Sequence, residues 1–129
     1  MNGTGPRTIY DFFAGRNCVR LWLDENLGAS AELEGLLYFA RAGFVLEPPR
    51  ARAIHGKKYH GLFEFRFLVN KVQHRVFFCY GRFERGAVIL LAGGTHKQGV
   101  YDPPSVLDTA LNRKLLSESD RRYVVEHEL

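Results

Sequence analysis

Residues 62–97 read LFEFRFLVNKVQHRVFFCYGRFERGAVILLAGGTHK, and this stretch decides the fold class. Phenylalanines at 63, 65 and 67 alternate with other side chains, which is the two-residue period of a β-strand. We expect two further strands over 75–80 and 87–92. Turns at Asn70-Lys71 and at 84–86 would join the three strands into an antiparallel meander.

The sequence outside this stretch predicts a short first strand and three helices. Residues 8–13 suit a strand, and apolar residues at three- and four-residue steps predict helices over 17–27 and 30–41. Gly28-Ala29 joins these two helices into a hairpin, and Gly43 ends the second one. Asp102 is expected to cap a last helix whose inward residues include Leu115.

The predicted order of elements, β-α-α-β-β-β-α, is that of an α+β domain. It combines a small antiparallel β-sheet with an N-terminal helical hairpin and a C-terminal helix. We expect the helices to pack on one face of the sheet. The other face would be open, with Glu64, Arg66 and Arg75 projecting from it.

The chain of 129 residues has the size of one domain. We place its core at about residues 8–116, followed by a charged tail at 117–129. Apolar residues make up 46% and charged residues 25%, which argues for a folded globular domain. The sequence shows no apolar run of membrane-span length and no signal-peptide core, so we expect a cytoplasmic protein with no membrane partner.

The positive charge is concentrated in the middle of the chain. Residues 48–101 hold ten of the 18 basic residues and only two of the 14 acidic ones. A polyanion such as RNA is the natural partner of such a surface. Cys18 and Cys79 lack the CxxC spacing of metal or redox sites, so we read them as free thiols in a reducing compartment and expect no metal or other cofactor.

A basic segment without any acidic residue separates Glu47 from Glu64. Its cationic side chains could follow a phosphate backbone. The alternative is a solvated loop that only keeps the protein soluble. The candidate RNA-binding residues of this segment are Arg50, Arg52, Lys57 and Lys58.

Arg66 and Arg75 lie on adjacent predicted strands. Cationic groups fixed on a rigid sheet can hold a phosphate and stabilise the charge that develops when the phosphate is attacked. The alternative is that Glu64 forms cross-strand ion pairs with them. One carboxylate cannot neutralise two guanidinium groups, which favours a functional role.

Histidines and a tyrosine near the predicted third strand are further candidates. A histidine is the usual general acid or base near neutral pH, so His96 and the adjacent Lys97 are catalytic candidates, and His74 is a further candidate for RNA binding. Tyr101 could stack on a base or hold a phosphate oxygen, and it could equally cover the last helix. The histidine spacings match no zinc motif.

Four segments of the chain resemble the RelE/HigB toxin superfamily, in its HigB-like, phage-derived branch. That branch has a leucine-aromatic-Glu-x-Arg strand, an Arg-hydrophobic strand, a hydrophobic third strand and a basic segment before a final helix. The matching segments here are 62–66 (LFEFR), 74–77 (HRVF), 88–92 (VILLA) and 95–97 (THK). The resemblance covers about residues 8–116.

The resemblance implies a RelE-like, microbial-RNase-like fold and a type II toxin that cuts mRNA in the ribosome without a metal, using the RNA 2′-hydroxyl as nucleophile. It implies that Arg66 and Arg75 contact the scissile phosphate. His96 and Lys97 would form the basic pair before the last helix, with Tyr101 as a further candidate. The basic loop would meet ribosomal RNA, and a helix-turn-helix antitoxin would be the cognate partner.

Two other functions stay open from the sequence. The first is a non-catalytic module of the same fold that binds RNA or a host protein, since a fold tolerates the loss of its chemistry. The second is a gyrase poison of the ParE type within the same superfamily.

Overall fold

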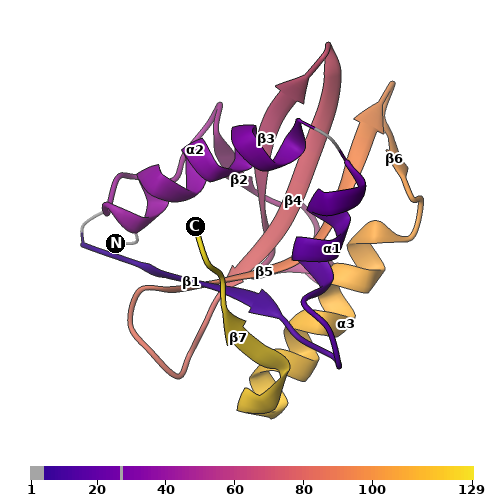
Figure 1. The fold of residues 1–129 in the computed structure, drawn as a ribbon. Coiled ribbons are helices and arrows are strands. Elements are labelled where there is room, and N and C mark those ends of the chain that lie inside the picture. Colours follow the sequence, from indigo (N-terminus) through magenta and orange to yellow (C-terminus); the bar gives the residue numbers. More distant parts are fainter. Residues whose placement is uncertain (1–4, 27) are drawn as a thin grey trace.

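The computed structural model describes residues 5–26 and 28–129. These residues form seven strands, three α-helices and two short 3₁₀-helices (Figure 1). The strands are β1 (Thr8–Phe12), β2 (Ala51–Ala53), β3 (Phe63–Val69), β4 (Val72–Tyr80), β5 (Ala87–Lys97), β6 (Val100–Asp102) and β7 (Val124–Glu126). The helices are α1 (Cys18–Glu25), α2 (Ala29–Arg41), α3 (Val106–Ser119), η1 (Lys57–Tyr59) and η2 (Arg121–Tyr123).

All seven strands belong to one sheet, in the order β2-β3-β4-β5-β1-β7, with β6 paired to β5. The meander predicted from the sequence is present as β3-β4-β5. The sheet is nevertheless mixed and larger than expected, because β1 pairs in parallel with β5, on the side of β5 that faces away from β4. The protein is therefore an α+β protein with a mostly antiparallel sheet.

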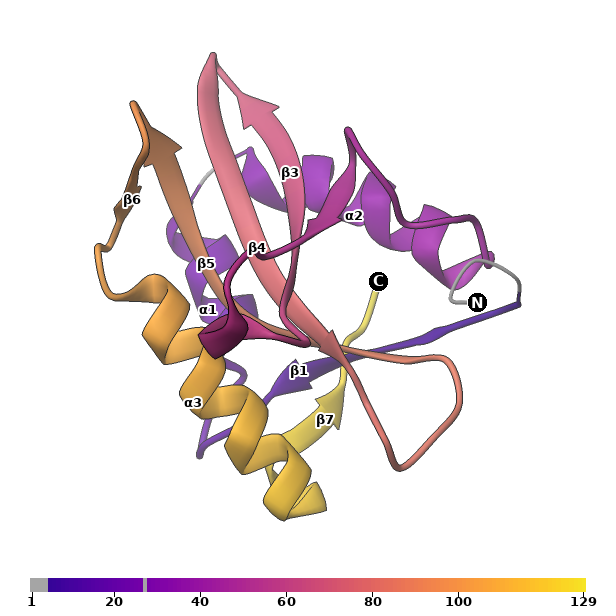
Figure 2. The same cartoon turned by 180° about the vertical axis from the view of Figure 1, so that it is seen from behind.

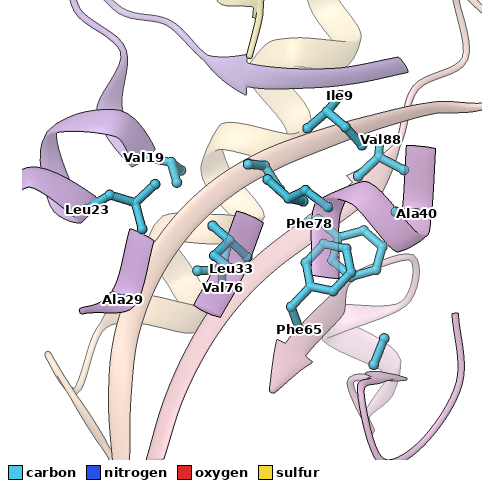
Figure 3. Packing of buried hydrophobic residues seen from close by; sticks show 13 residues of the cluster. Ile9, Val19, Leu23, Ala29, Leu33, Ala40, Phe65, Val76, Phe78 and Val88 are labelled. Carbon is cyan, nitrogen blue, oxygen red and sulfur yellow. The ribbon is translucent and has the colours of Figure 1, made fainter. Parts of the chain in front are cut away.

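Helices α1 and α2 cover one face of the sheet. Phe65 and Val76 are fully buried beneath them, against Leu33 of α2 (Figure 3). Phe78 stacks on Phe65, with 4.2 Å between the ring centroids. Large apolar side chains at every second position of β3 and β4 therefore build a dry core on this face.

The expectation that the other face of the sheet is open was wrong. Helix α3 packs against that face, on the side opposite α1 and α2, as the two views in Figures 1 and 2 show. Phe77 and Cys79 of β4 point to this side and are buried under it. Leu115 was expected inward and is 55% exposed, while Leu116 packs against the core in its place.

Strand β5 runs five residues beyond its predicted end. Gly93 and Gly94 lie inside the strand. A Cβ atom on Gly93 would come within 2.3 Å of the Trp22 indole, and one on Gly94 within 2.9 Å of the Asp102 carbonyl oxygen. Glycine is thus required here by the close approach of α1 on one face and of β6 on the other.

Several predicted boundaries change in the structure. Asp102 does not cap the last helix, because it belongs to β6 and α3 begins at Val106 after Ser105. Helix α2 matches its prediction to one residue, and α1 ends at Glu25. The expected end of that helix, at Leu27, lies outside the described residues.

The charged C-terminal segment completes the sheet. Helix α3 continues to Ser119, and β7 then pairs with β1. His127 Nδ1 lies 2.8 Å from an Asp11 carboxylate oxygen, and both side chains are buried. None of the helices in the described ranges is long and apolar enough to cross a membrane.

Candidate functional site

Strand register brings basic, polar and aromatic side chains onto one part of the sheet that α3 leaves uncovered. Neighbouring residues on paired strands share a face, so each row of partners forms a line across the sheet. The rows are Arg52-Glu64-Phe77, then Arg66-Arg75-Gly94, then Gln73-His96-Tyr101. This is the same face on which Phe77 and Cys79 meet α3 further along the strands.

Glu64 is the centre of this cluster. Its side chain is fully buried, and each carboxylate oxygen has two partners. Arg52 Nε donates to Oε2 at 2.9 Å, and Arg66 Nε lies 3.5 Å from the same oxygen. Arg75 Nε lies 3.7 Å from Oε1, which also accepts a hydrogen bond from the Tyr101 hydroxyl at 3.3 Å. The cross-strand ion pairs considered from the sequence are thus present.

Arg75 is the buried member of the cluster, with only 3% of its surface exposed. Its Nη1 donates to the His74 carbonyl at 2.9 Å, and its Nη2 donates to Gln73 Oε1 at 2.7 Å. Burial lowers the pKa of this guanidinium, while the Glu64 charge opposes the shift. Arg75 therefore acts as a fixed positive charge beneath the surface.

Arg66 and Arg52 are the guanidinium groups that a ligand can reach. The side chains of Arg66 and Arg52 are 32% and 41% exposed. Within the described part of the chain, the Arg66 side chain forms an ion pair with Glu64 but no hydrogen bond, and its Nε is a buried donor without an acceptor. Three guanidinium groups around one carboxylate leave a surplus of two positive charges, which suits an anion.

Tyr101 and His96 border the cluster on β6 and β5. Burial and the neighbouring Glu64 carboxylate raise the pKa of Tyr101, so its hydroxyl keeps its proton at neutral pH. The His96 ring lies 4.9 Å from the Tyr101 ring, centroid to centroid, and is partly exposed. The two side chains place an O–H group and an imidazole at the same border of the site.

The structure does not bring every predicted residue to this site. His74 lies on the opposite face, buried between Phe67 and Trp22. Lys58 pairs with Asp108 of α3 at 2.9 Å, and Lys57 lies beside it on η1. The remaining two candidates do not contact Glu64: Arg50 precedes β2, and Lys97 follows His96 on β5, where strand alternation directs it to the opposite face.

A groove with a volume of about 710 Å³ opens beside the cluster, between α2 and the outer edge of β3. Phe39 and Phe67 contribute apolar surface, and Arg66 and Arg75 connect the groove to the cluster around Glu64. Arg50 lies over the Phe39 ring, 4.5 Å from its centroid. The groove thus combines aromatic surface with positive charge, the combination that binds single-stranded nucleic acid.

Sequence reasoning missed two contributions to the site. The first is Gln73, which lies two residues before Arg75 on β4 and therefore on the same face of the sheet. Arg52 was assigned to a loop, whereas β2 places it opposite Glu64. Strand β2 is three residues long, too short for its alternation to be recognised.

The described residues contain no cluster of three or more His, Cys, Asp or Glu side chains that could hold a metal ion. No family model, no curated protein and no solved structure matches the chain.

Proposed function

We propose that this protein is a metal-independent endoribonuclease of the toxin type that cleaves mRNA during translation. The observation that supports this proposal best is the surplus of positive charge around the buried Glu64. Phosphodiester cleavage by a 2′-hydroxyl passes through a transition state with more negative charge on the phosphorane oxygens than in the ground state. Rigid cations aimed at that position stabilise the transition state more than the substrate.

Each residue of the cluster has a separate role in this proposal. Arg66 and Arg52 contact the non-bridging oxygens of the scissile phosphate, because their guanidinium groups are within reach of a ligand. Arg75 is a positioning residue, since its donors are used by Gln73 and the His74 carbonyl. Glu64 holds the three arginines in place, as a rigid sheet site requires.

Proton transfer is assigned to the border of the site. His96 accepts the proton of the 2′-hydroxyl as its oxygen attacks phosphorus, and it returns a proton to the 5′-oxygen as the bond between phosphorus and that oxygen breaks. Tyr101 keeps its hydroxyl proton and donates a hydrogen bond, either to Glu64 or to a phosphate oxygen. Lys97 follows His96 on β5, where strand alternation directs its side chain to the opposite face, so the proposal gives it no proton-transfer step.

Primer extension on an mRNA translated in a cell-free system tests the proposal. The parent protein should produce discrete cuts in frame with codons, and the cuts should disappear when ribosomes are omitted. Arg66→Gln should slow cleavage by about 10²–10³-fold, the usual cost of removing one transition-state contact. Arg82→Gln is the matched control, because it removes an exposed arginine on the remote β4–β5 loop. Intact mRNA with the folded parent protein would overturn the nuclease proposal.

A non-catalytic RNA- or protein-binding module of the same fold is the second candidate function. The observation that favours it is that Arg75 already donates a hydrogen bond to Gln73 and forms an ion pair with Glu64 without a ligand. A binding module would hold RNA without cutting it. Its affinity would fall gradually and with a smaller salt dependence when Arg50, Arg52, Lys57 or Lys58 is neutralised. A gyrase poison would instead inhibit supercoiling and leave mRNA intact.

The proposal includes the partners and compartment that such a toxin needs. Translated mRNA and the ribosome would be the substrate complex in the cytoplasm. A cognate helix-turn-helix antitoxin would bind the toxin, and its site on this chain is left open. Co-expression with the neighbouring gene products, followed by affinity purification through this chain, would identify such a partner.

A further inference from the structure

A separate notch lies between two hairpin turns next to the cluster around Glu64. The turn that joins β3 to β4 and the turn that joins β5 to β6 project together, as Figure 1 shows. The notch between them has a volume of about 380 Å³. Its lining residues are Lys71, Val72, Gln73, His96, Lys97 and Gln98.

The chemistry of this notch suits an anion. Its lining has two lysines, two glutamines and a histidine, and it has no carboxylate. Neither lysine forms an ion pair with any described residue, and both side chains are exposed. Ammonium and amide groups that converge from two turns can all donate hydrogen bonds to the same oxygen atoms.

The backbone at the notch is kept in an unfavourable conformation. Asn70 and Lys71 both have positive φ angles, 49° and 68°. The second position of such a two-residue hairpin turn strongly favours glycine, and lysine pays a steric cost there. A lysine at this position indicates that its side chain has a use beyond closing the turn.

Gln73 connects the notch to the arginine cluster. Its side-chain oxygen accepts from Arg75 Nη2 at 2.7 Å, while the same residue lines the notch. Gln73, which pairs with His96, lies two residues before Arg75 on β4. Two residues of an extended strand span about 6.6–6.8 Å. Consecutive phosphates of an extended RNA strand have a similar separation.

We infer that the notch is a second phosphate subsite, which holds the phosphate next to the one at Arg66. This inference rests on the proposed function, and it specifies the ligand as single-stranded RNA with at least two successive phosphates. Lys71 and Lys97 contact the second phosphate, and Gln73 keeps the two subsites in register. Lys71 is thereby assigned a role in substrate positioning.

Binding of short RNA probes tests this inference. The probes are a 2′-O-methyl dinucleotide with one phosphate and a 2′-O-methyl trinucleotide with two, since methylation prevents attack by the 2′-oxygen. Affinities are measured by NMR titration of the labelled protein. The parent protein should bind the trinucleotide about tenfold more tightly than the dinucleotide, which is one charge-assisted contact. Lys71→Gly should remove most of this gain and leave dinucleotide binding unchanged, and Lys97→Gln should also remove most of the gain.

The variants and probes distinguish a failure of the second phosphate subsite from a failure of the proposed function. Lys71→Gly relaxes the turn, so a loss of binding cannot be attributed to misfolding, and Arg82→Gln controls for one lost charge elsewhere. If Lys71→Gly retains the gain from the second phosphate, or weakens both probes equally, the subsite is wrong while the proposed function stands. If the parent protein binds neither probe, the subsite is overturned, while the primer-extension experiment decides the proposed function separately.

Discussion

The two faces of the β3–β4 hairpin are built from alternating residues of the same two strands, and they differ completely in character. On one face, Phe65, Val76 and Phe78 are fully buried under α1 and α2. On the other face, Glu64, Arg66 and Arg75 form a charged network at the end of the strands that α3 does not cover. One set of side chains is apolar, and the other set consists of arginines arranged around a buried carboxylate.

On this face, the buried charges of Glu64 and Arg75 are paired with each other. A buried carboxylate is costly unless cations and hydrogen-bond donors surround it, and Glu64 has four such partners. The apolar face provides the stability that permits an excess of positive charge on the other face. The following changes test this division of roles, from the largest expected effect to the smallest.

Phe78→Ala should have the largest effect on stability, because it removes a ring from the centre of the apolar face. Phe78 is fully buried and stacks on Phe65. We expect the free energy of unfolding to fall by about 3–5 kcal/mol in urea denaturation. Leu68→Ala, on the exposed end of β3, should change it by less than about 0.5 kcal/mol. Equal losses at both positions would refute the comparison of the faces.

Glu64→Gln should reduce stability and strengthen anion binding at the same time. Removal of the carboxylate leaves the buried Arg75 without its counter-charge, at a cost of about 3 kcal/mol. The same change frees Arg52 and Arg66 for a ligand, so affinity for a single-stranded RNA oligonucleotide should increase. Arg66→Gln should cost at most about 1 kcal/mol and weaken RNA binding. Unfolding curves and fluorescence anisotropy measure both quantities. If Glu64→Gln left stability unchanged, Glu64 would not be the anchor of the site.

Stability should fall at alkaline pH because of groups buried under α3 and beside it. Burial raises the pKa of the Cys79 thiol from 9.0 to about 12. Between these two pH values the thiol is deprotonated in the unfolded chain and still protonated in the folded protein. The free energy of unfolding therefore declines by about 1.4 kcal/mol per pH unit. The raised pKa values of Tyr10 and Tyr101 act in the same direction above pH 10. Urea titrations from pH 8 to 11 measure the decline, and Cys79→Ala should flatten it. If the stability of Cys79→Ala declined with pH as steeply as that of the parent protein, other groups would be responsible for the decline.

Lys71→Gly should have the smallest effect on stability, and a favourable one. Glycine relieves the strain of a positive φ angle, and its greater entropy in the unfolded chain offsets part of the gain. We expect a net stabilisation of about 0.5 kcal/mol by urea denaturation. The matched change Val72→Ala alters an exposed residue of ordinary conformation and should not stabilise the protein. A destabilised Lys71→Gly protein would show that the lysine supports the turn itself.

Local patterns in the sequence predicted part of the candidate site correctly. The alternation in LFEFR and HRVF placed Arg66 and Arg75 on adjacent strands, and the register of the structure puts them directly opposite each other. The ion pair with Glu64 was also foreseen as an alternative. The contributions of Arg52 and Gln73 were not, because a strand of three residues and an uncharged side chain give no signal of their own.

The amino-acid sequence alone determined the β3-β4-β5 meander, the two N-terminal helices and the concentration of basic residues in the middle of the chain. These features depend on local periodicity and composition, which are visible within a window of a few residues. Tertiary structure decided the rest: the parallel pairing of β1 with β5, the packing of α3 on the second face, and the burial of Glu64 among three arginines. Contacts between residues far apart in sequence depend on register and on which surfaces remain to be covered, and no local pattern encodes either.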